Sequence, residues 1–193
     1  MRGLLIAFEG LDQSGKQTQA ELLRDRLTDA GRRVTLLSFP DYQTAIGSEI
    51  GRALRGERDY TPDVMQLLYV ANRYECKGDI TRAKEAGTIL VCDRYLASSV
   101  AYGEAQGLDR GWLLEIQKYL PRPDLTILLD IPPEVSARRK TADRDKYERD
   151  LAMLARVRDS YLRQVADGWL RLDGTRDRDI VAADVQSAVL AMM

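Results

Sequence analysis

The sequence contains no histidine, and this absence removes several kinds of catalytic site. A Ser-His-Asp triad, a Cys-His dyad and a zinc site with histidine ligands all require an imidazole. Only two cysteines are present, Cys76 and Cys92, and they do not form a CxxC pair. Because two such cysteines are too few for a disulfide framework, we expect the protein to work in a reducing compartment.

An excess of charge of one sign and long apolar runs are also missing. Lys and Arg total 29 and Asp and Glu total 30, which gives a formal net charge of −1. Because binding to duplex nucleic acid needs a basic face, we expect no nucleic-acid partner. The first apolar run, residues 4–8, is too short for a signal peptide, and no run approaches the roughly 18 residues of a membrane span. We therefore expect no membrane association and a cytoplasmic location.

The residues that are present suit one folded domain. The chain has 193 residues, of which 45% are hydrophobic and 31% are charged, so it can form a core beneath a solvated surface. Several short apolar runs predict strands, and two of them are apolar on both faces, as buried parallel strands are. The predicted strands are residues 4–8, 34–39, 88–92, 125–130 and 169–172.

Segments with helical periodicity separate these predicted strands. The first spans about residues 16–30, with Gly31 as its stop signal. A second begins at Thr61-Pro62-Asp63, which combines an N-cap, a proline in the first turn and an acid near the positive helix end. Others begin near residues 132 and 179. Alternating strands and helices predict an α/β fold, with three α/β/α layers around a five-stranded parallel sheet.

The segment from Gly10 to Lys16 has the GxxxxGK pattern of a phosphate-binding loop between a strand and a helix. Gly10 and Gly15 allow the backbone N–H groups to surround a phosphate at the positive helix end, and Lys16 adds a mobile positive charge. We therefore predict a bound nucleoside triphosphate. The residues predicted to bind it are Gly10, Leu11, Asp12, Gln13, Ser14, Gly15, Lys16, Gln17 and Thr18.

The position after Lys16 departs from this pattern. A Ser or Thr usually follows the lysine and binds Mg²⁺ through its hydroxyl, but this chain has Gln17. Magnesium keeps several of its waters and needs few protein ligands, so it can bind without that hydroxyl. The sequence does not support direct coordination by Gln17. Asp93, which follows a predicted strand, is the candidate metal ligand, acting through water.

Polar and aromatic residues follow two further segments. Arg94 lies at the carboxyl end of a buried strand, the edge where open α/β sheets bind ligands, and it can hold a phosphate. Tyr95, Ser99 and Tyr102 are predicted to share one face of the next helix. Elsewhere, Tyr69 and Arg73 are four residues apart, so a ring can stack on a base while a guanidinium donates to its edge. Ordinary core packing is the alternative for the aromatic member of this pair.

These segments together resemble the thymidylate kinase family of P-loop nucleoside monophosphate kinases. The resemblance covers nearly the whole length, with its motifs in order. A phosphate loop alone occurs in many folds, whereas its combination with the later motifs is specific. The motifs are Phe8-Glu9-Gly10-Leu11-Asp12-Gln13-Ser14-Gly15-Lys16, Phe39-Pro40-Asp41-Tyr42, Ala71-Asn72-Arg73-Tyr74-Glu75, Asp93-Arg94-Tyr95, Leu120-Pro121-Arg122-Pro123-Asp124 and Tyr147-Glu148-Arg149.

The resemblance implies one domain over residues 1–193, with a P-loop NTP hydrolase-type fold and a mobile lid at about residues 138–149. It implies transfer of the γ-phosphoryl group of ATP to dTMP, which gives dTDP and ADP for dTTP synthesis, with Mg²⁺ as cofactor. It also implies a homodimer. From charge alone, an ordinary solvated surface is the favoured interpretation of residues 138–149.

The resemblance also implies roles for the acceptor-side residues. Asp12 contacts the sugar 3′-hydroxyl or the acceptor-phosphate region, and Arg94 holds the acceptor phosphate. Tyr102 crowds the 2′ position, which favours deoxyribose. Relatives often have an arginine after the Phe-Pro pair, where this chain has Asp41 and Tyr42. We therefore expect the Tyr42 hydroxyl to donate one hydrogen bond to the phosphate.

The remaining implied roles concern the two bases. Tyr69 stacks on thymine, Arg73 donates to the base edge, and Ser99 faces the pyrimidine. Arg139 packs against adenine.

Relatives take their catalytic cation from one of two places. Some carry an arginine in the loop at the position of Gln13, and others supply the cation from the lid. Since Gln13 has no charge, we expect a lid residue, with Arg144 favoured over Lys140 and Lys146. The implied catalytic residues are Lys16, Asp12, Arg94 and Arg144.

Two other functions compete with this one. A kinase for another nucleoside monophosphate would share the same loop. A non-catalytic nucleotide-binding or switch protein would explain Gln17 as lost metal chemistry, although the sequence has no NKxD motif.

Overall fold

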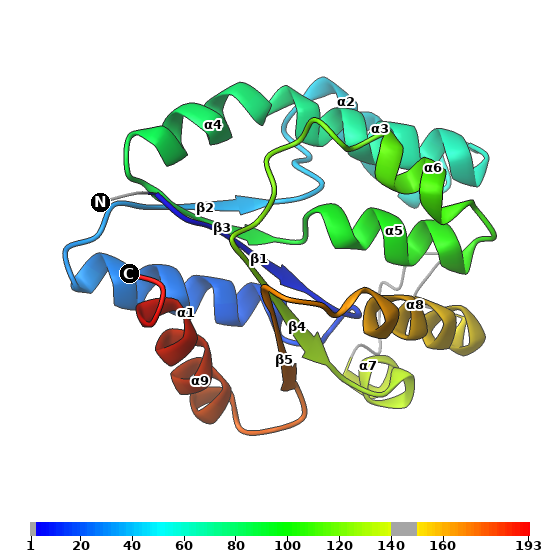
Figure 1. Cartoon of the computed structure of the whole chain (residues 1–193). Helices are drawn as coiled ribbons and strands as arrows, with labels where there is room; N and C mark the ends of the chain where they lie inside the picture. Colours follow the sequence, from blue (N-terminus) through cyan, green and yellow to red (C-terminus); the bar gives the residue numbers. More distant parts are fainter. Residues whose placement is uncertain (1–2, 140–149) are drawn as a thin grey trace.

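A computed structural model of the chain describes residues 3–139 and 150–193, and its centre is a parallel β-sheet (Figure 1). The strand order in the sheet is β2-β3-β1-β4-β5, and every pairing is parallel. The predicted strands are confirmed, and each predicted boundary lies within one residue of the observed one. The strands are β1 (Leu5–Glu9), β2 (Val34–Ser38), β3 (Ile89–Asp93), β4 (Leu125–Asp130) and β5 (Trp169–Asp173).

Helices cover both faces of this sheet, so the predicted three-layer α/β/α fold is confirmed. The predicted helices are present, and further helices lie between them. The helices of the described residues are α1 (Lys16–Asp29), α2 (Ala45–Leu54), α3 (Pro62–Glu75), α4 (Lys77–Glu85), α5 (Leu96–Ala105), α6 (Arg110–Glu115), α7 (Pro133–Arg139), α8 (Leu151–Gln164) and α9 (Arg178–Leu190).

The alternation of side chains along β1 divides the core between the two faces. Ile6 and Phe8 pack with buried side chains of α1 and α9. Leu5 and Ala7 point to the opposite face and pack with Ile80 of α4. A third apolar cluster joins α5 to α8 beside the end of β4. Figure 1 shows α1 and α9 on one side of the sheet, with α4 and α5 on the other.

Parallel pairing brings the carboxyl ends of the central strands together. Phe8 of β1 is in register with Asp93 of β3, and Glu9 is in register with Leu128 of β4. The phosphate-loop segment and the Asp93-Arg94 pair therefore leave the sheet at the same edge, although they are far apart in sequence. Helix α3 packs against α5 and supplies the remaining wall above this edge.

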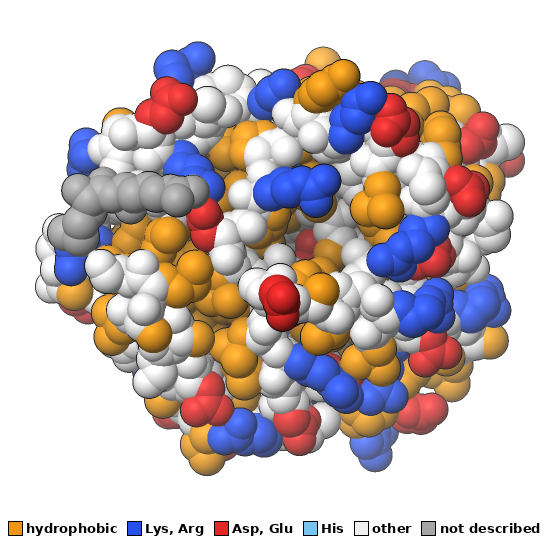
Figure 2. Space-filling model, viewed as in Figure 1, with side chains coloured by type: hydrophobic (Ala, Val, Ile, Leu, Met, Phe, Trp, Pro, Cys, Tyr) orange, Lys and Arg blue, Asp and Glu red, His pale blue; other side chains and the backbone are white. Residues whose placement is uncertain are grey.

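The surface agrees with the balanced composition. Figure 2 shows basic and acidic side chains interspersed over the face that it draws. Within residues 3–139 and 150–193, no helix is both long enough and apolar enough to cross a membrane. Most of the predicted lid, residues 140–149, lies outside the described residues.

Candidate functional site

One cavity at the carboxyl edge of the sheet brings together the residues predicted to bind the acceptor. Its lining combines aromatic and apolar side chains with a few polar and charged groups, as is usual for small-molecule sites. All the predicted acceptor residues line it, namely Asp12, Tyr42, Tyr69, Arg73, Arg94, Ser99 and Tyr102. The sequence analysis assigned no binding role to the other lining residues, which are Phe39, Pro40, Leu54, Gln66, Ser98 and Gln106.

The phosphate-loop segment has the backbone that its glycines allow. Gly10 has a φ of 138° and Gly15 a φ of 94°, which other residues rarely adopt. A Cβ atom added at Gly10 would lie 2.5 Å from the carbonyl oxygen of Leu129, so that site also lacks space for a side chain. No side chain caps the start of α1 within the described residues. Its first N–H groups are therefore suited to bind an anion.

Lys16 lies inside this loop and is only 5% exposed. Its Nζ donates to the Leu11 carbonyl oxygen at 2.6 Å. Burial and repulsion from Arg94 lower the pKa of Lys16 to about 8, against the opposing attraction of nearby carboxylates. The ammonium is thus held within the loop, and a bound phosphate can replace the Leu11 carbonyl oxygen as its hydrogen-bond acceptor.

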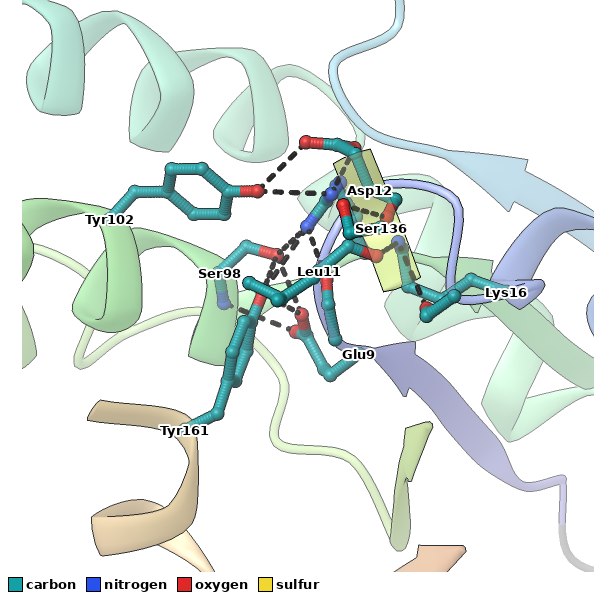
Figure 3. Close-up of polar contacts among 11 residues, drawn as sticks. Glu9, Leu11, Asp12, Lys16, Ser98, Tyr102, Ser136 and Tyr161 are labelled. Carbon is teal, nitrogen blue, oxygen red and sulfur yellow. Dashed lines mark hydrogen bonds and ion pairs between the residues drawn. The ribbon is translucent and has the colours of Figure 1, made fainter. Parts of the chain in front are cut away.

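Asp12, Arg94 and Tyr102 form a polar cluster at the cavity wall. Figure 3 shows the Tyr102 hydroxyl directed at Asp12. Arg94 Nη2 donates to Asp12 Oδ1, and the Tyr102 hydroxyl donates to Asp12 Oδ2 at 2.9 Å. Burial alone would raise the pKa of Asp12, but the charges of Arg94 and Lys16 and these hydrogen bonds hold it well below its usual value. The Arg94 guanidinium also lies 5.3 Å from the centre of the Tyr102 ring. The cluster is therefore ionised, positioned and accessible from the cavity.

Glu9 is a buried residue of the site whose role the sequence analysis missed. It is fully buried at the end of β1, and its carboxylate accepts backbone N–H groups at the start of α5, among them that of Tyr95 at 2.9 Å. It also accepts the hydroxyls of Ser98 (2.6 Å) and Tyr161 (3.2 Å), which Figure 3 shows pointing toward it. Those two hydroxyls in turn accept from Arg94 Nη1. Glu9 therefore fixes the position of the Arg94 guanidinium indirectly. The available signal was an acid that ends an otherwise apolar, buried strand.

Arg73 also lines the cavity and is 3% exposed. Its Nη1 donates to Ser99 Oγ at 2.6 Å, and its guanidinium lies 5.9 Å from the centre of the Phe39 ring. Burial lowers the pKa of Arg73 from its very high usual value. Tyr69, one turn earlier on α3, lines the same cavity. The pair predicted from its spacing is thus brought to one site.

Asn72 is another polar residue with an unexpected role. It is fully buried, and its side chain makes two hydrogen bonds with the backbone of Asp41. Its Oδ1 accepts the Asp41 N–H at 2.8 Å, and its Nδ2 donates to the Asp41 carbonyl oxygen at 3.3 Å. It also donates to Thr44 Oγ1 at 2.9 Å. These bonds hold the segment after the cis Phe39–Pro40 peptide, and they place Tyr42 at the cavity rim with 52% of its side chain exposed.

Some predicted residues lie elsewhere. Gln17 is exposed, and its amide donates to Glu21 at 2.9 Å along α1. Thr18 is also exposed. The prediction that Tyr95 shares a helix face with Ser99 and Tyr102 is wrong. Tyr95 precedes α5 with a non-helical backbone (φ −157°, ψ −132°), so helical spacing does not govern its side chain, and its ring packs against Phe39 in the core.

Arg139 and the start of the predicted lid are connected to the phosphate loop. The exposed Arg139 donates to the carbonyl oxygens of Gln13 at 3.0 Å and Gly174 at 3.1 Å. Ser136 Oγ donates to the Asp12 carbonyl oxygen at 2.7 Å. Helix α7 therefore lies directly over the loop. Arg144, Lys140 and Lys146 fall in residues 140–149, outside the described part of the chain.

A divalent cation fits one position of this site. Asp93 Oδ1 is buried at the end of β3 and has no hydrogen-bond partner among the described residues. An unpaired buried carboxylate oxygen favours a cation or its bound water. The described residues contain no group of three or more Asp, Glu or Cys side chains placed to hold a metal, so a cation here would depend on its own waters and on phosphate.

Comparisons with known proteins agree with this geometry. The thymidylate kinase family model matches residues 8–185. The thymidylate kinase of Schizosaccharomyces pombe is 40% identical over 148 residues, which cover 77% of this chain and 70% of that protein. The thymidylate kinase of Dictyostelium discoideum is 32% identical over 188 residues, which cover 96% of this chain and 84% of that protein. A solved structure of thymidylate kinase from Candida albicans superposes with a TM-score of 0.88 at 31% identity, over 98% of this chain and 92% of that chain.

Proposed function

The chain belongs to the thymidylate kinase family, and from this premise we propose that it transfers the γ-phosphoryl group of ATP to dTMP, giving dTDP and ADP. It is a nucleoside monophosphate kinase with the P-loop fold. The observation that carries the function is the adjacency of two sites: a glycine-framed phosphate loop and a cavity whose walls hold Tyr69, Arg73 and Arg94. Asp12 belongs to both.

On the donor side, the loop N–H groups and Lys16 hold the phosphates of ATP. The Leu11 carbonyl contact shows where Lys16 rests, and a phosphate offers the ammonium a stronger, charged acceptor. Arg139, placed against the loop, packs on adenine. Asp93 would hold Mg²⁺ through water, and the bound cation would neutralise phosphate charge as transfer proceeds.

On the acceptor side, Arg94 holds the phosphate of dTMP. Its Nη1 is fixed by Ser98, Tyr161 and the backbone, so the guanidinium needs little reordering when substrate binds. Its Nη2 contacts Asp12, which lies where the sugar 3′-hydroxyl and the phosphate meet. Tyr42 adds a hydrogen bond from the rim of the cavity.

The nucleoside is read deeper in the cavity. Tyr69 stacks on thymine, and Arg73 donates to a carbonyl of the base with Ser99 beside it. Tyr102 crowds the 2′ position and so favours deoxyribose. These roles are supported by their shared position along the cavity wall and by the burial of Arg73 and Ser99.

The transfer step relies on positioning and charge stabilisation and requires no covalent protein nucleophile. A chain without histidine is compatible with this chemistry. We assign the transition-state cation to Arg144, delivered when the lid closes and excludes water, with Lys140 and Lys146 as alternatives. The uncharged Gln13 supports a source outside the loop.

We also propose that the protein is a cytoplasmic homodimer. Exposed apolar side chains on α3 and near α6, including Leu67, Leu114 and Tyr119, support an association surface. Sedimentation velocity would report the oligomeric state. The near-neutral charge supports small-molecule partners over nucleic acid.

A coupled assay of ADP release tests the proposed function. Release must require ATP, dTMP and Mg²⁺ together. Rates with dUMP, dCMP and dGMP separate dTMP from other acceptors, since Tyr69 and Arg73 favour a pyrimidine. ATP binding with no acceptor-dependent ADP release would instead indicate a non-catalytic nucleotide-binding protein, and a faster reaction with another monophosphate would change the assigned acceptor.

A further inference from the structure

Gln66 is a buried polar residue in the cavity wall that the roles above do not use. It is 1% exposed on α3, and it lines the acceptor cavity. Neither its Oε1 nor its Nε2 has a hydrogen-bond partner among the described residues. Buried amide groups in folded proteins are almost always paired, because burying a donor or acceptor without a partner destabilises the protein. Gln66 therefore has an unfilled donor and an unfilled acceptor on a side chain that lines the cavity.

Helix geometry places Gln66 on the same side of α3 as the base-binding residues. It precedes Tyr69 by three positions and Arg73 by seven, and these spacings share one helix face. The Arg73 side chain contacts the preceding turn of α3, where its Nη1 lies 3.4 Å from the Tyr69 carbonyl oxygen. Its buried Nε also lacks a partner within the described part of the chain. Unpaired hydrogen-bonding groups therefore lie on both sides of Tyr69.

We propose that Gln66 is a second base-recognition residue, which reads the dione edge of the pyrimidine; this rests on the proposed function. That edge presents a carbonyl oxygen, an N3–H donor and a second carbonyl oxygen. Arg73 only donates, so it can serve a carbonyl but not the N3–H. The Gln66 Oε1 accepts the N3–H, its Nε2 donates to one flanking carbonyl, and Arg73 donates to the other.

The decisive variant is Gln66→Met, which keeps the length and apolar stem of the side chain and removes both hydrogen bonds. We expect kcat/KM to fall about 10- to 100-fold with dTMP and by the same factor with dUMP, because both bases carry the dione edge. The KM for ATP should stay constant. Circular dichroism and ADP binding report whether the variant is folded.

Gln117→Met is the matched control. Gln117 is 4% exposed and its Oε1 also lacks a partner among the described residues, but it lies outside the acceptor cavity. This variant should keep the wild-type kcat/KM. A further experiment compares dTMP with N3-methyl-dTMP, used as a competitive inhibitor, in the wild type and in Gln66→Met. Methylation removes the donor, so it should weaken binding more in the wild type than in Gln66→Met.

Three results would overturn the assignment of Gln66: wild-type activity in Gln66→Met, a loss confined to dTMP or to dUMP, or an equal loss in Gln117→Met. A loss confined to one acceptor would place Gln66 beside C5 of the base. A wild-type protein without dTMP-dependent ADP release would overturn the proposed function, and this assignment with it. The two failures are therefore distinguishable.

Discussion

The acceptor and donor sides of this site are built in different ways. The acceptor side consists of side chains from α3, α5 and the ends of β1 and β3, and its central residues are buried and bonded to one another. The donor side is mostly backbone: a loop with positive φ angles at Gly10 and Gly15, the uncapped start of α1, and the buried Lys16. Gln17 and Arg139 beside it are exposed. The acceptor side is therefore preorganised, whereas the donor side depends on the positive-φ backbone of its loop and on the charge of the phosphates that it binds.

This difference separates stability from turnover. A change on the acceptor side breaks contacts that also hold the fold, as Glu9 does for the start of α5. A change on the donor side, such as the loss of Lys16, removes a charge that makes few contacts within the protein. Variants of the two sides should therefore differ in how far a loss of activity is accompanied by a loss of thermal stability.

Replacing Lys16 should have the largest effect on turnover. Lys16→Met should lower kcat by about 10³- to 10⁴-fold, since it removes a positioned charge from the transferring phosphates. Thermal stability should hold or rise, because burial of the ammonium is unfavourable in the substrate-free protein. Lys84→Met is the control: this lysine bonds Asp124 at 2.7 Å and lies outside the acceptor cavity. If Lys16→Met retained kcat, the loop would not hold the transferring phosphates.

The lid residue should come next. Arg144→Ala should lower kcat by about 10³-fold, the scale of a catalytic arginine. The KM for dTMP should stay nearly constant, because the proposed role of this residue is to stabilise the transition state and not to bind dTMP. Steady-state kinetics with Lys140→Ala and Lys146→Ala in parallel identify the source of the cation. An unchanged kcat in Arg144→Ala, with a loss in one of the lysine variants, would move the role to that lysine.

Arg94 should show the coupling expected of the acceptor side. Arg94→Ala would leave Asp12 without its charge partner and so combine misfolding with lost binding. Arg94→Lys keeps the charge but loses the planar fork, so we expect kcat/KM for dTMP to fall about 10²-fold and the melting temperature to drop as well. The KM for ATP should change little. An equal rise in both KM values would contradict the division of the site into two sides.

The sequence predicted the sheet because its strands are short apolar runs, two of them apolar on both faces, with turn signals between them. It predicted the acceptor residues through motif positions, and these do line one cavity. It did not predict the roles of Glu9, Asn72 and Gln66, because local periodicity carries no information about distant partners. Glu9, for example, accepts from the N–H of Tyr95, 86 positions away. Tyr95 was misplaced for a related reason, since its non-helical backbone is set by the bend after β3.

Tyr102 tests a smaller contribution on the acceptor side. Tyr102→Phe removes the hydroxyl that bonds Asp12 at 2.9 Å, so kcat/KM for dTMP should fall about 10-fold, as for one hydrogen bond to a charged group. The preference for dUMP over UMP should persist, because the ring that crowds the 2′ position remains. Tyr119→Phe, on an exposed tyrosine outside the acceptor cavity, should have no effect. If Tyr102→Phe lost the preference for dUMP over UMP, the hydroxyl and not the ring would be the source of that preference.

The smallest expected effect is a pH dependence confined to the donor side. The pKa of Lys16 is lowered to about 8 by burial and by Arg94, so in the substrate-free protein its ammonium loses its proton above that pH. The phosphates of ADP bind the protein when Lys16 is charged. The fraction of protein with a charged Lys16 falls from about one-half at pH 8 to about one-tenth at pH 9, so the Kd of ADP should rise about five-fold over that interval. In Lys16→Met, the Kd of ADP measured by titration calorimetry should not change between pH 8 and pH 9. The Kd of dTMP should stay level over the same interval, because the pKa of Asp12 lies far below it and the Arg94 guanidinium stays charged. A parallel rise for dTMP would mean that the two sides share one titrating group.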